Sequence, residues 1–143
     1  VDACPVPISV DTYKAETADY AMSTGAHIMN DIWGLQYGPE PGKMAAVAAK
    51  HGVPVVVMHN QEGTEYGDII GDMKRFFIRS SIIADQAGMR QDQIITDPGI
   101  GFGKTFEQNV YVMKHLRELT ALPYPMLLGT SRKALSERSS TCP

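Results

Sequence analysis

Short apolar segments of β-type composition recur along the chain, and each ends on polar residues or glycine. The five segments are Val6–Val10, His27–Met29, Val53–Met58, Ile94–Ile95 and Met126–Leu128. Between them, apolar residues recur every three or four positions, which is typical of amphipathic helices. These helical patterns end at residues that commonly terminate helices, namely Gly25, Gly52, Gly88 and Pro123. The alternation predicts parallel strands covered by helices.

The repeat length of this alternation is compatible with two architectures. The units average about 30 residues, and eight such units make a (β/α)8 barrel of roughly 250 residues. An open doubly wound sheet would be complete with about five strands, and periodicity does not separate the two. Nearly every predicted strand ends on a polar or functional residue, which favours the barrel because the carboxyl ends of its strands line one site. We therefore predict an α/β fold, a TIM barrel represented by about five βα units, in one partial domain spanning residues 1–143.

Composition and charge exclude several classes of function. The 143 residues are 43% apolar and 20% charged, which is ordinary for a soluble globular domain. A formal net charge of −3 argues against non-specific binding to nucleic acid or to anionic membranes. No apolar run approaches the roughly 20 residues of a membrane span, and no signal peptide opens the chain.

The two cysteines, Cys4 and Cys142, lie near opposite ends of the sequence and lack Cys-x-x-Cys spacing. Two free thiols in a reducing compartment are expected, and a disulfide between them is the alternative. The sequence begins at Val1 rather than at methionine, which suggests an excised piece of a longer protein.

The stretch Ile94–Thr105 places two apolar residues before Asp97 and then a loop with three glycines. A carboxylate at a strand end, followed by backbone able to approach a ligand closely, predicts a binding site. The Gly-Lys-Thr at its end resembles a phosphate-binding P-loop, but that motif requires glycine where Pro98 stands. Proline has no N–H to donate to a phosphate, so we reject that interpretation. Thr105 and Gln108 match a helix capping box.

Polar side chains follow the ends of the predicted strands, and parallel strands would bring them to one mouth. They are Asp11, Asn30, Met58 with His59, Asp97, and Ser131-Arg132-Lys133. A carboxylate accepts two adjacent N–H donors of a flat heterocycle, and an asparagine donates and accepts along the same edge. A lysine at the mouth binds an anion or a ring carbonyl. Met58 and Phe102 offer apolar faces to a planar ring, although a methionine at this place is more typical of the core.

Several of these residues also have structural interpretations, which the sequence leaves open. Asp11 precedes a helix that it is able to cap, and Asn30-Asp31 is able to form a turn. Lys133 is compatible with a solvated helix position. His59 stands at a strand end, but no second histidine has metal-ligand spacing, so we reject a metal role. Lys104 is interpreted as a structural cation beside the glycine loop.

Five blocks of the sequence, in this order and spacing, together resemble dihydropteroate synthase. They are Pro7–Thr12, Gly25–Ile32, Met58-His59, Asp97–Lys104 and Gly129–Lys133, and the agreement extends from residue 6 to residue 133. The resemblance implies a (β/α)8 barrel and a transferase of folate biosynthesis, the class that sulfonamides target. Such an enzyme joins 6-hydroxymethyl-7,8-dihydropterin diphosphate to p-aminobenzoate, giving 7,8-dihydropteroate and diphosphate.

The same resemblance implies roles for individual residues. Asp11, Asn30 and Asp97 hold the edge of the pterin, and Lys133 contacts the pterin near the aminobenzoate. The residues implied to line the pocket are Ile32, Met58, Gly101, Phe102 and Gly129, with Ser131 towards the aminobenzoate. The catalytic residues would be Asp11, Asp97 and Lys133, acting by charge placement rather than by a covalent intermediate.

The resemblance further implies magnesium as cofactor, with its protein ligand outside this chain. The expected partners are the two small-molecule substrates and, at full length, a second copy in a homodimer. A cytoplasmic enzyme without nucleic-acid or membrane partners is expected.

Compared with that family, the chain corresponds approximately to barrel strands 3 to 7. Strands 1, 2 and 8, with the asparagine for magnesium and the basic groups for diphosphate, fall outside it, so the piece is expected to be inactive alone. Ala134–Arg138 departs from the family pattern, and Asn60 stands where many members have methionine. Two alternatives stay open, a pterin-binding methyltransferase domain and a non-catalytic pterin-binding remnant. The Ser131-Arg132-Lys133 block favours the synthase, because an aminobenzoate carboxylate and a diphosphate require cations.

Overall fold

The computed structural model describes residues 5–39 and 41–130, in which four parallel strands form one sheet. The strands are β1 (Ser9–Asp11), β2 (Ile28–Asp31), β3 (Val55–Met58) and β4 (Ile94–Asp97), and they lie side by side in the order β1-β2-β3-β4. All three pairings are parallel. Four of the five predicted strands are therefore confirmed. Each ends within two residues of its predicted carboxyl end.

Helices connect the strands, as the apolar periodicity predicts. They are α1 (Ala15–Ser23), α2 (Lys43–His51), α3 (Ile69–Gln86), α4 (Phe106–Lys114) and α5 (Leu116–Thr120), with a short 3-10 turn at η1 (Gln91–Gln93). Gly52 ends α2 in the left-handed conformation, with φ of 65° and ψ of 30°. Thr105 and Gln108 form the predicted capping box at the start of α4. None of the helices in the described ranges combines the length and the apolar character that crossing a membrane requires.

Two predictions about the C-terminal part are wrong in detail. The single helix expected before Pro123 is two helices, because the backbone at His115 turns to φ −113° and ψ 21°, outside the helical region. The segment Met126–Leu128 lies beside β4 as expected, but it forms one parallel bridge, from Thr96 to Met126, rather than a strand. Pro125 has no N–H to donate, so a longer ladder cannot extend towards the preceding residues.

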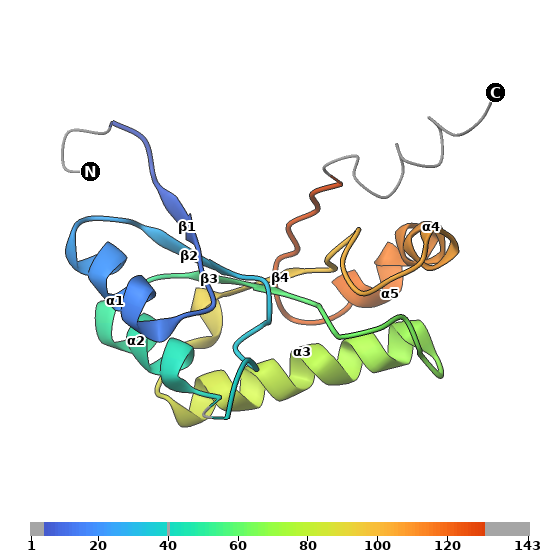
Figure 1. The fold of residues 1–143 in the computed structure, drawn as a ribbon, viewed down its shortest axis with the longest axis horizontal. Helices are drawn as coiled ribbons and strands as arrows, with labels where there is room; N and C mark the ends of the chain where they lie inside the picture. Colours follow the sequence, from blue (N-terminus) through green and yellow to red (C-terminus); the bar gives the residue numbers. More distant parts are fainter. Residues whose placement is uncertain (1–4, 40, 131–143) are drawn as a thin grey trace.

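The helices cover one face of the sheet only. In Figure 1, α1, α2 and α3 all lie on the same side of the four strands. Met29, Val55 and Val57 point to that side and belong to the buried core, with less than 2% of their surface exposed. Strands in consecutive order with their helices on one side form a segment of a (β/α)8 barrel, since a doubly wound sheet carries helices on both faces. The barrel prediction is confirmed.

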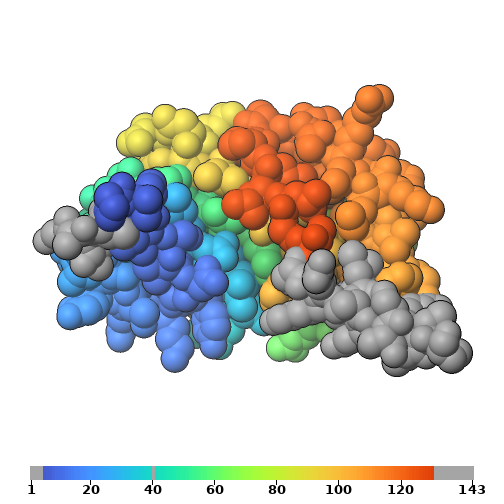
Figure 2. Space-filling model, turned by 90° about the horizontal axis from the view of Figure 1, so that it is seen from above, coloured from blue at the N-terminus to red at the C-terminus, as the bar shows by residue number. Residues whose placement is uncertain are grey.

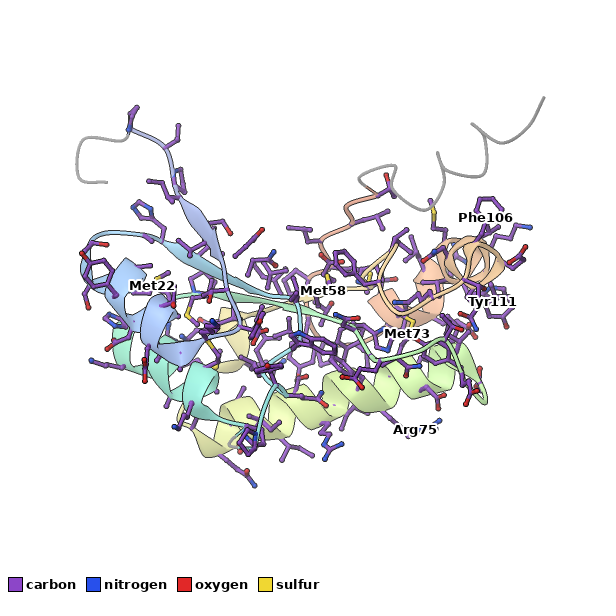
Figure 3. All side chains as sticks on the ribbon, viewed as in Figure 1. Met22, Met58, Met73, Arg75, Phe106 and Tyr111 are labelled. Atoms are coloured by element: carbon purple, nitrogen blue, oxygen red, sulfur yellow. The ribbon has the colours of Figure 1, made fainter. Side chains whose placement is uncertain are left out.

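The other face of the sheet is the one that a complete barrel would enclose. Seen from that side, the middle of the chain, in cyan and green, lies between the blue N-terminal part and the orange C-terminal part (Figure 2). Met58 lies in the middle of the sheet, whereas Arg75 lies on the far side of α3 (Figure 3). The helix-free face is therefore the expected location of the site.

Candidate functional site

Strand register places four of the predicted residues on the same face of the sheet. Asp11 pairs with Asn30, which in turn pairs with Val56. Two residues further along β3, Met58 pairs with Asp97. Because paired residues of parallel strands point to the same side and side chains alternate along a strand, all four face away from the helices. They stand at the carboxyl ends of four adjacent strands, which is where barrel enzymes place their sites.

At the β1–β2 end, Asp11 and Asn30 are joined directly. The Asn30 Nδ2 donates a hydrogen bond of 2.7 Å to Asp11 Oδ1. The Asn30 Oδ1 is buried and has no hydrogen-bond partner among the described residues. A buried acceptor of this kind is costly unless a ligand or water satisfies it. Asp11 does not cap α1, where the N-terminal residue Lys14 has no side-chain cap and its N–H bonds Thr12 Oγ1 instead.

The turn that the sequence allowed at Asn30-Asp31 is made by Asp31 alone. Its Oδ1 accepts from the Trp33 N–H at 2.9 Å, and its Oδ2 accepts from the Leu35 N–H at 3.0 Å. The residue is fully buried, and burial raises the pKa of its carboxyl against the opposing effect of these two bonds. Asp31 therefore holds the loop after β2 by itself. The Asn30 side chain is not needed for that turn and is available to the site.

At the β4 end, Asp97 and the glycine loop form a compact structure. Asp97 is 9% exposed, and its Oδ1 accepts from the Gly99 N–H at 2.8 Å. Burial raises the pKa of this carboxyl, while the Gly99 N–H and the charge of Lys104 act to lower it. Gly99 has φ of +66°, and a Cβ there would lie 2.1 Å from the His59 carbonyl oxygen. Glycine is required at this position, because the loop after β4 packs directly on the backbone after β3.

Lys104 is buried beneath this loop rather than directed to the site. Its Nζ lies 2.9 Å from His59 Nδ1 and donates to the carbonyl oxygens of Gly99 at 3.1 Å and Phe102 at 2.9 Å. Burial lowers its pKa to about 7, and the nearby Asp97 carboxylate opposes that shift. Burial and the charge of Lys104 lower the pKa of His59 to about 3, so the imidazole is neutral. The interpretation of Lys104 as a structural cation agrees with these contacts.

Two further residues hold the loop, and sequence reasoning missed both. Asn109, fully buried in α4, accepts the Gly101 N–H on its Oδ1 at 2.9 Å. Tyr66 donates from its hydroxyl to the Gly103 carbonyl at 2.5 Å. Neither residue stands at a strand end, and only their closeness to the loop in space reveals their role. The nearest sequence signal for either residue is that Asn109 directly follows Gln108 of the capping box.

The remaining predicted pocket residues are less closely assembled. Ile32 lines a cavity of about 200 Å³ together with Asp11 and residues 12 to 14. Phe102 is partly buried, whereas Gly101 and Gly129 are exposed. Ser131 and Lys133 lie outside the described residues. Within those residues, no group of three or more His, Cys, Asp or Glu side chains is arranged to bind a metal ion.

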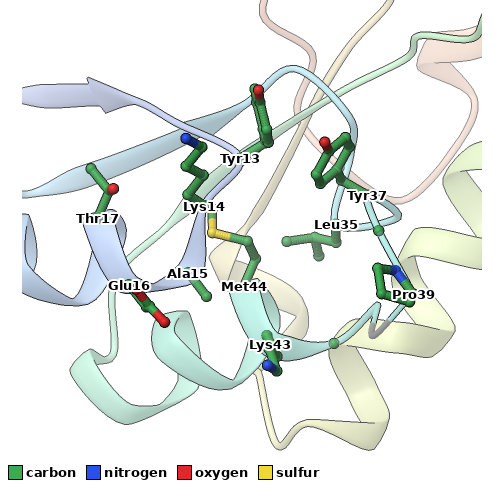
Figure 4. Close-up of a pocket in the computed structure, with 12 residues that line it drawn as sticks. Tyr13, Lys14, Ala15, Glu16, Thr17, Leu35, Tyr37, Pro39, Lys43 and Met44 are labelled. Atoms are coloured by element: carbon green, nitrogen blue, oxygen red, sulfur yellow. The ribbon is translucent and has the colours of Figure 1, made fainter.

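A second cavity of about 370 Å³ lies beside the β1–β2 end (Figure 4). Leu35 and Met44 form its floor, and Tyr13 and Tyr37 stand at its rim with ring centroids 4.4 Å apart. None of the predicted site residues lines it. The mouth of the site is therefore flanked by an aromatic rim on the side of β1 and β2.

Comparison with known proteins relates this geometry to one family. The profile of the family described as "Pterin binding enzyme" matches residues 1–142. A dihydropteroate synthase of Bacillus subtilis is 52% identical over 128 residues, which are 90% of this chain and 44% of that protein.

Two solved structures have the same fold. A dihydropteroate synthase of Clostridium difficile in the presence of pteroic acid superposes with a TM-score of 0.91 at 44% identity, over 97% of this chain and 52% of that chain. A dihydropteroate synthase of Xanthomonas albilineans with 4-aminobenzoic acid superposes with a TM-score of 0.88 at 34% identity, over 99% and 51% of the two chains. The present chain thus spans about half the length of the relatives it matches.

Proposed function

Because this chain belongs to the family of pterin-binding enzymes, we propose that it is the pterin-holding part of a dihydropteroate synthase. The observation that carries the proposal is the shared face of Asp11, Asn30 and Asp97 at the carboxyl ends of their strands. The Clostridium difficile structure that resembles this chain at 44% identity was determined with pteroic acid, a pterin joined to 4-aminobenzoic acid. We propose the same class of ligand for this face.

The three polar residues suit the edge of a pterin ring. That edge carries adjacent N–H donors and a ring nitrogen acceptor, and an ionised carboxylate accepts two parallel N–H bonds. Asp97 provides a partly desolvated carboxylate, and the unpartnered Oδ1 of Asn30 provides a second acceptor. Met58 lies on the same face between them, where it would contact the plane of the ring. We assign pterin binding to Asp11, Asn30, Met58 and Asp97.

The proposed reaction is a substitution at the methylene carbon of the pterin. The bond from that carbon to the diphosphate oxygen breaks, and diphosphate leaves with the electron pair. The amine nitrogen of p-aminobenzoate forms the new bond and then releases a proton to water. Positive charge develops on the pterin during this substitution, and the carboxylates of Asp11 and Asp97 would stabilise it electrostatically. No nucleophilic side chain is required, because an aromatic amine is itself the nucleophile.

The proposal extends to Ile32, Gly101, Phe102 and Gly129 as pocket residues, and to Ser131 and Lys133 as contacts nearer the aminobenzoate. It also includes magnesium at the diphosphate, a homodimer and a cytoplasmic location. The residues of the described part do not form a magnesium site by themselves, so we derive no step of the reaction through the ion.

The two alternative functions are distinguished by different observations. A methyltransferase domain would bind the pterin through the same three residues but would have no use for p-aminobenzoate. The relatives named above are synthases, and one of them was determined with 4-aminobenzoic acid, which favours the synthase. A non-catalytic remnant would bind pterin and support no turnover in any context.

A graft tests the proposal directly. The 128 matched residues of the Bacillus subtilis enzyme would be replaced by their counterparts from this chain. We expect the grafted enzyme to form dihydropteroate and to restore growth without added folate products in a strain lacking the synthase. The matched control is the same graft with Asp97→Ala, which should remove turnover while leaving the fold detectable by circular dichroism.

Two results would contradict the proposal. A folded graft that binds neither pteroic acid nor p-aminobenzoate would exclude the synthase assignment. A graft that binds pterin but never p-aminobenzoate would favour the methyltransferase domain. The chain alone is expected to bind pterin weakly at most and to show no turnover, because five βα units do not close an eight-stranded barrel.

A further inference from the structure

The glycine loop after β4 is held by hydrogen bonds from three side chains, and two of them, Lys104 and Asn109, are buried. Its Gly99 and Phe102 carbonyls both accept from the single ammonium of Lys104. Its Gly101 N–H donates to Asn109, and its Gly103 carbonyl accepts from Tyr66. These partners come from α4, from the loop before α3, and from the end of the glycine loop itself. Because these hydrogen bonds hold several backbone groups of the loop, the loop conformation is set before a ligand binds.

Lys104 is the centre of this arrangement. It is 8% exposed, and three acceptors surround its Nζ between 2.9 and 3.1 Å. An ammonium group has three protons to donate, so this set satisfies all of them. The two carbonyls belong to residues on either side of the turn, and drawing both to one point closes the loop. A neutral side chain of the same length would leave both carbonyls without this donor.

His59 provides the third acceptor and links Lys104 back to the sheet. Its Nδ1 faces the ammonium, which places the proton of the neutral ring on Nε2. Its backbone N–H donates to the Asp97 carbonyl at 2.9 Å, and its ring lies edge-on to Phe76 with centroids 4.9 Å apart. His59 is thus fixed in the core, and Lys104 takes its position from it.

The consequence for the site concerns Asp97. Its Oδ1 is used by the Gly99 N–H, whose carbonyl is held by Lys104. Its Oδ2 makes no hydrogen bond to the described residues, which leaves that oxygen for a ligand. The position of the carboxylate therefore depends on the position of Gly99. The positive charge of Lys104 also favours the ionised form of Asp97, the form that accepts N–H donors.

We propose that Lys104 is a positioning residue for pterin binding, which sets the glycine loop and Asp97 through His59 Nδ1 and the carbonyls of Gly99 and Phe102. The inference rests on the proposed function. It adds that Lys104, unlike Lys133, acts on pterin binding without contacting the substrate. Its effect should fall on the pterin and leave the aminobenzoate unaffected. The loop carries the pocket residues Gly101 and Phe102 and binds Asp97, whereas the contacts proposed nearer the aminobenzoate are Ser131 and Lys133.

The experiment uses the grafted enzyme with Lys104→Met, which keeps the length of the side chain and removes the ammonium. We expect the KM for the pterin diphosphate to rise by about 10- to 100-fold, and the KM for p-aminobenzoate to change by less than about twofold. Lys114→Met, at an exposed position of α4, is the matched control and should change neither constant. Thermal melts establish that each variant is folded at the assay temperature.

A double-mutant cycle gives a measurement that a purely structural role of Lys104 would leave unchanged. If Lys104 acts through Asp97, the losses in pterin affinity from Lys104→Met and Asp97→Asn should combine to clearly less than their product. Losses that multiply, or a folded Lys104→Met variant with a normal KM for pterin, would overturn the inference. Lys104→Gln, which is neutral but retains an amide NH2 able to donate to a carbonyl, replaces the methionine variant if that one does not fold. An intermediate pterin KM is then expected, and a normal one would overturn the inference.

Turnover of the unsubstituted graft separates this inference from the proposed function. If that graft is folded but inactive, the synthase assignment fails by itself. The Lys104 variants would then be judged by calorimetric titration with pteroic acid, where an unchanged affinity in Lys104→Met would still contradict the positioning role.

Discussion

The two ends of the sheet carry the same chemical group in opposite environments. At β1, the Asp11 carboxylate is exposed and is joined to Asn30 by one hydrogen bond. At β4, the Asp97 carboxylate is 9% exposed and is bonded to a loop that Lys104, Asn109 and Tyr66 hold in place. One end is thus an open pair of side chains on adjacent strands, and the other is a buried, preorganised structure.

This difference indicates how each end obtains its geometry. The β1–β2 end needs only parallel register, because residues paired across neighbouring strands are brought together by the ladder itself. The β3–β4 end needs long-range packing, since His59 and Lys104 are 45 residues apart in sequence. We expect substitutions to be tolerated at the first end and to be costly at the second. The predictions below, all made for the grafted enzyme, test that contrast from the largest expected effect to the smallest.

The largest effect is expected at Gly99. Gly99→Ala places a Cβ 2.1 Å from the His59 carbonyl oxygen at a φ of +66°, whereas Gly52→Ala meets open space at a φ of +65°. The left-handed conformation costs either alanine about 1–2 kcal/mol, and the overlap at Gly99 adds about 1–3 kcal/mol. Denaturant unfolding of the two variants therefore isolates the close approach of the two loops. Equal losses of stability would mean that the loop after β4 can move away from β3.

The next effect compares the two carboxylates. Asp97→Asn replaces a buried acceptor with a donor that faces another donor, and should weaken pterin binding by about 2–4 kcal/mol. Asp11→Asn makes the same change in an exposed position, where water competes for the bond, and should cost about 1 kcal/mol. Calorimetric titration with pteroic acid measures both. An equal or greater loss at Asp11 would reverse the assignment of Asp97 as the main anchor.

The contrast between the ends also marks what the sequence could predict. Strand ends and helix stops follow from local periodicity and from residues such as Gly52, so four strands and the capping box at Thr105 were predictable. The contact between Asp11 and Asn30 follows once the strands are known to be parallel neighbours. The residue types in the loop after β4 predict a site there as well.

The rest depends on packing that local patterns do not encode. The choice between barrel and doubly wound sheet needed the strand order and the single helix-covered face. The buried amide of Asn109 looks like any polar helix residue in the sequence, and nothing local distinguishes it. The break between α4 and α5 at His115 has no local sequence signal either, since the apolar positions continue across it with helical spacing.

A smaller effect is expected from acid at His59. The folded pKa of about 3 lies below the unfolded value of 6.5, so between these values the unfolded chain binds a proton that the folded chain does not. Stability contributed by the neutral ring is present above pH 6.5 and is lost as the pH falls towards 3. From pH 6.5 to pH 5 the loss should be about 2 kcal/mol, given a slope of about 1.4 kcal/mol per pH unit. Lys104, charged in both states below its pKa of about 7, adds little slope in this window.

Chemical denaturation at pH 6.5 and at pH 5 measures this loss. The control is His59→Gln, which keeps an acceptor for the Lys104 ammonium but does not titrate. Its difference in stability between the two pH values should be smaller than that of the unsubstituted graft by the contribution of this one residue. The same difference in both proteins would mean that other groups account for the sensitivity to acid.

The smallest effect is expected at Thr105, which lies beside Lys104 but belongs to the helix rather than to the loop contacts. Its Oγ1 accepts the Gln108 N–H at 3.2 Å, so Thr105→Ala removes one capping bond of α4 and should cost about 1 kcal/mol of stability. The glycine loop keeps its bonds to Lys104, Asn109 and Tyr66 in this variant. The KM for pterin should therefore stay within about twofold of the unsubstituted value while the melting temperature falls. A pterin KM that rises along with the loss of stability would mean that the start of α4, and not Lys104, sets the position of Asp97.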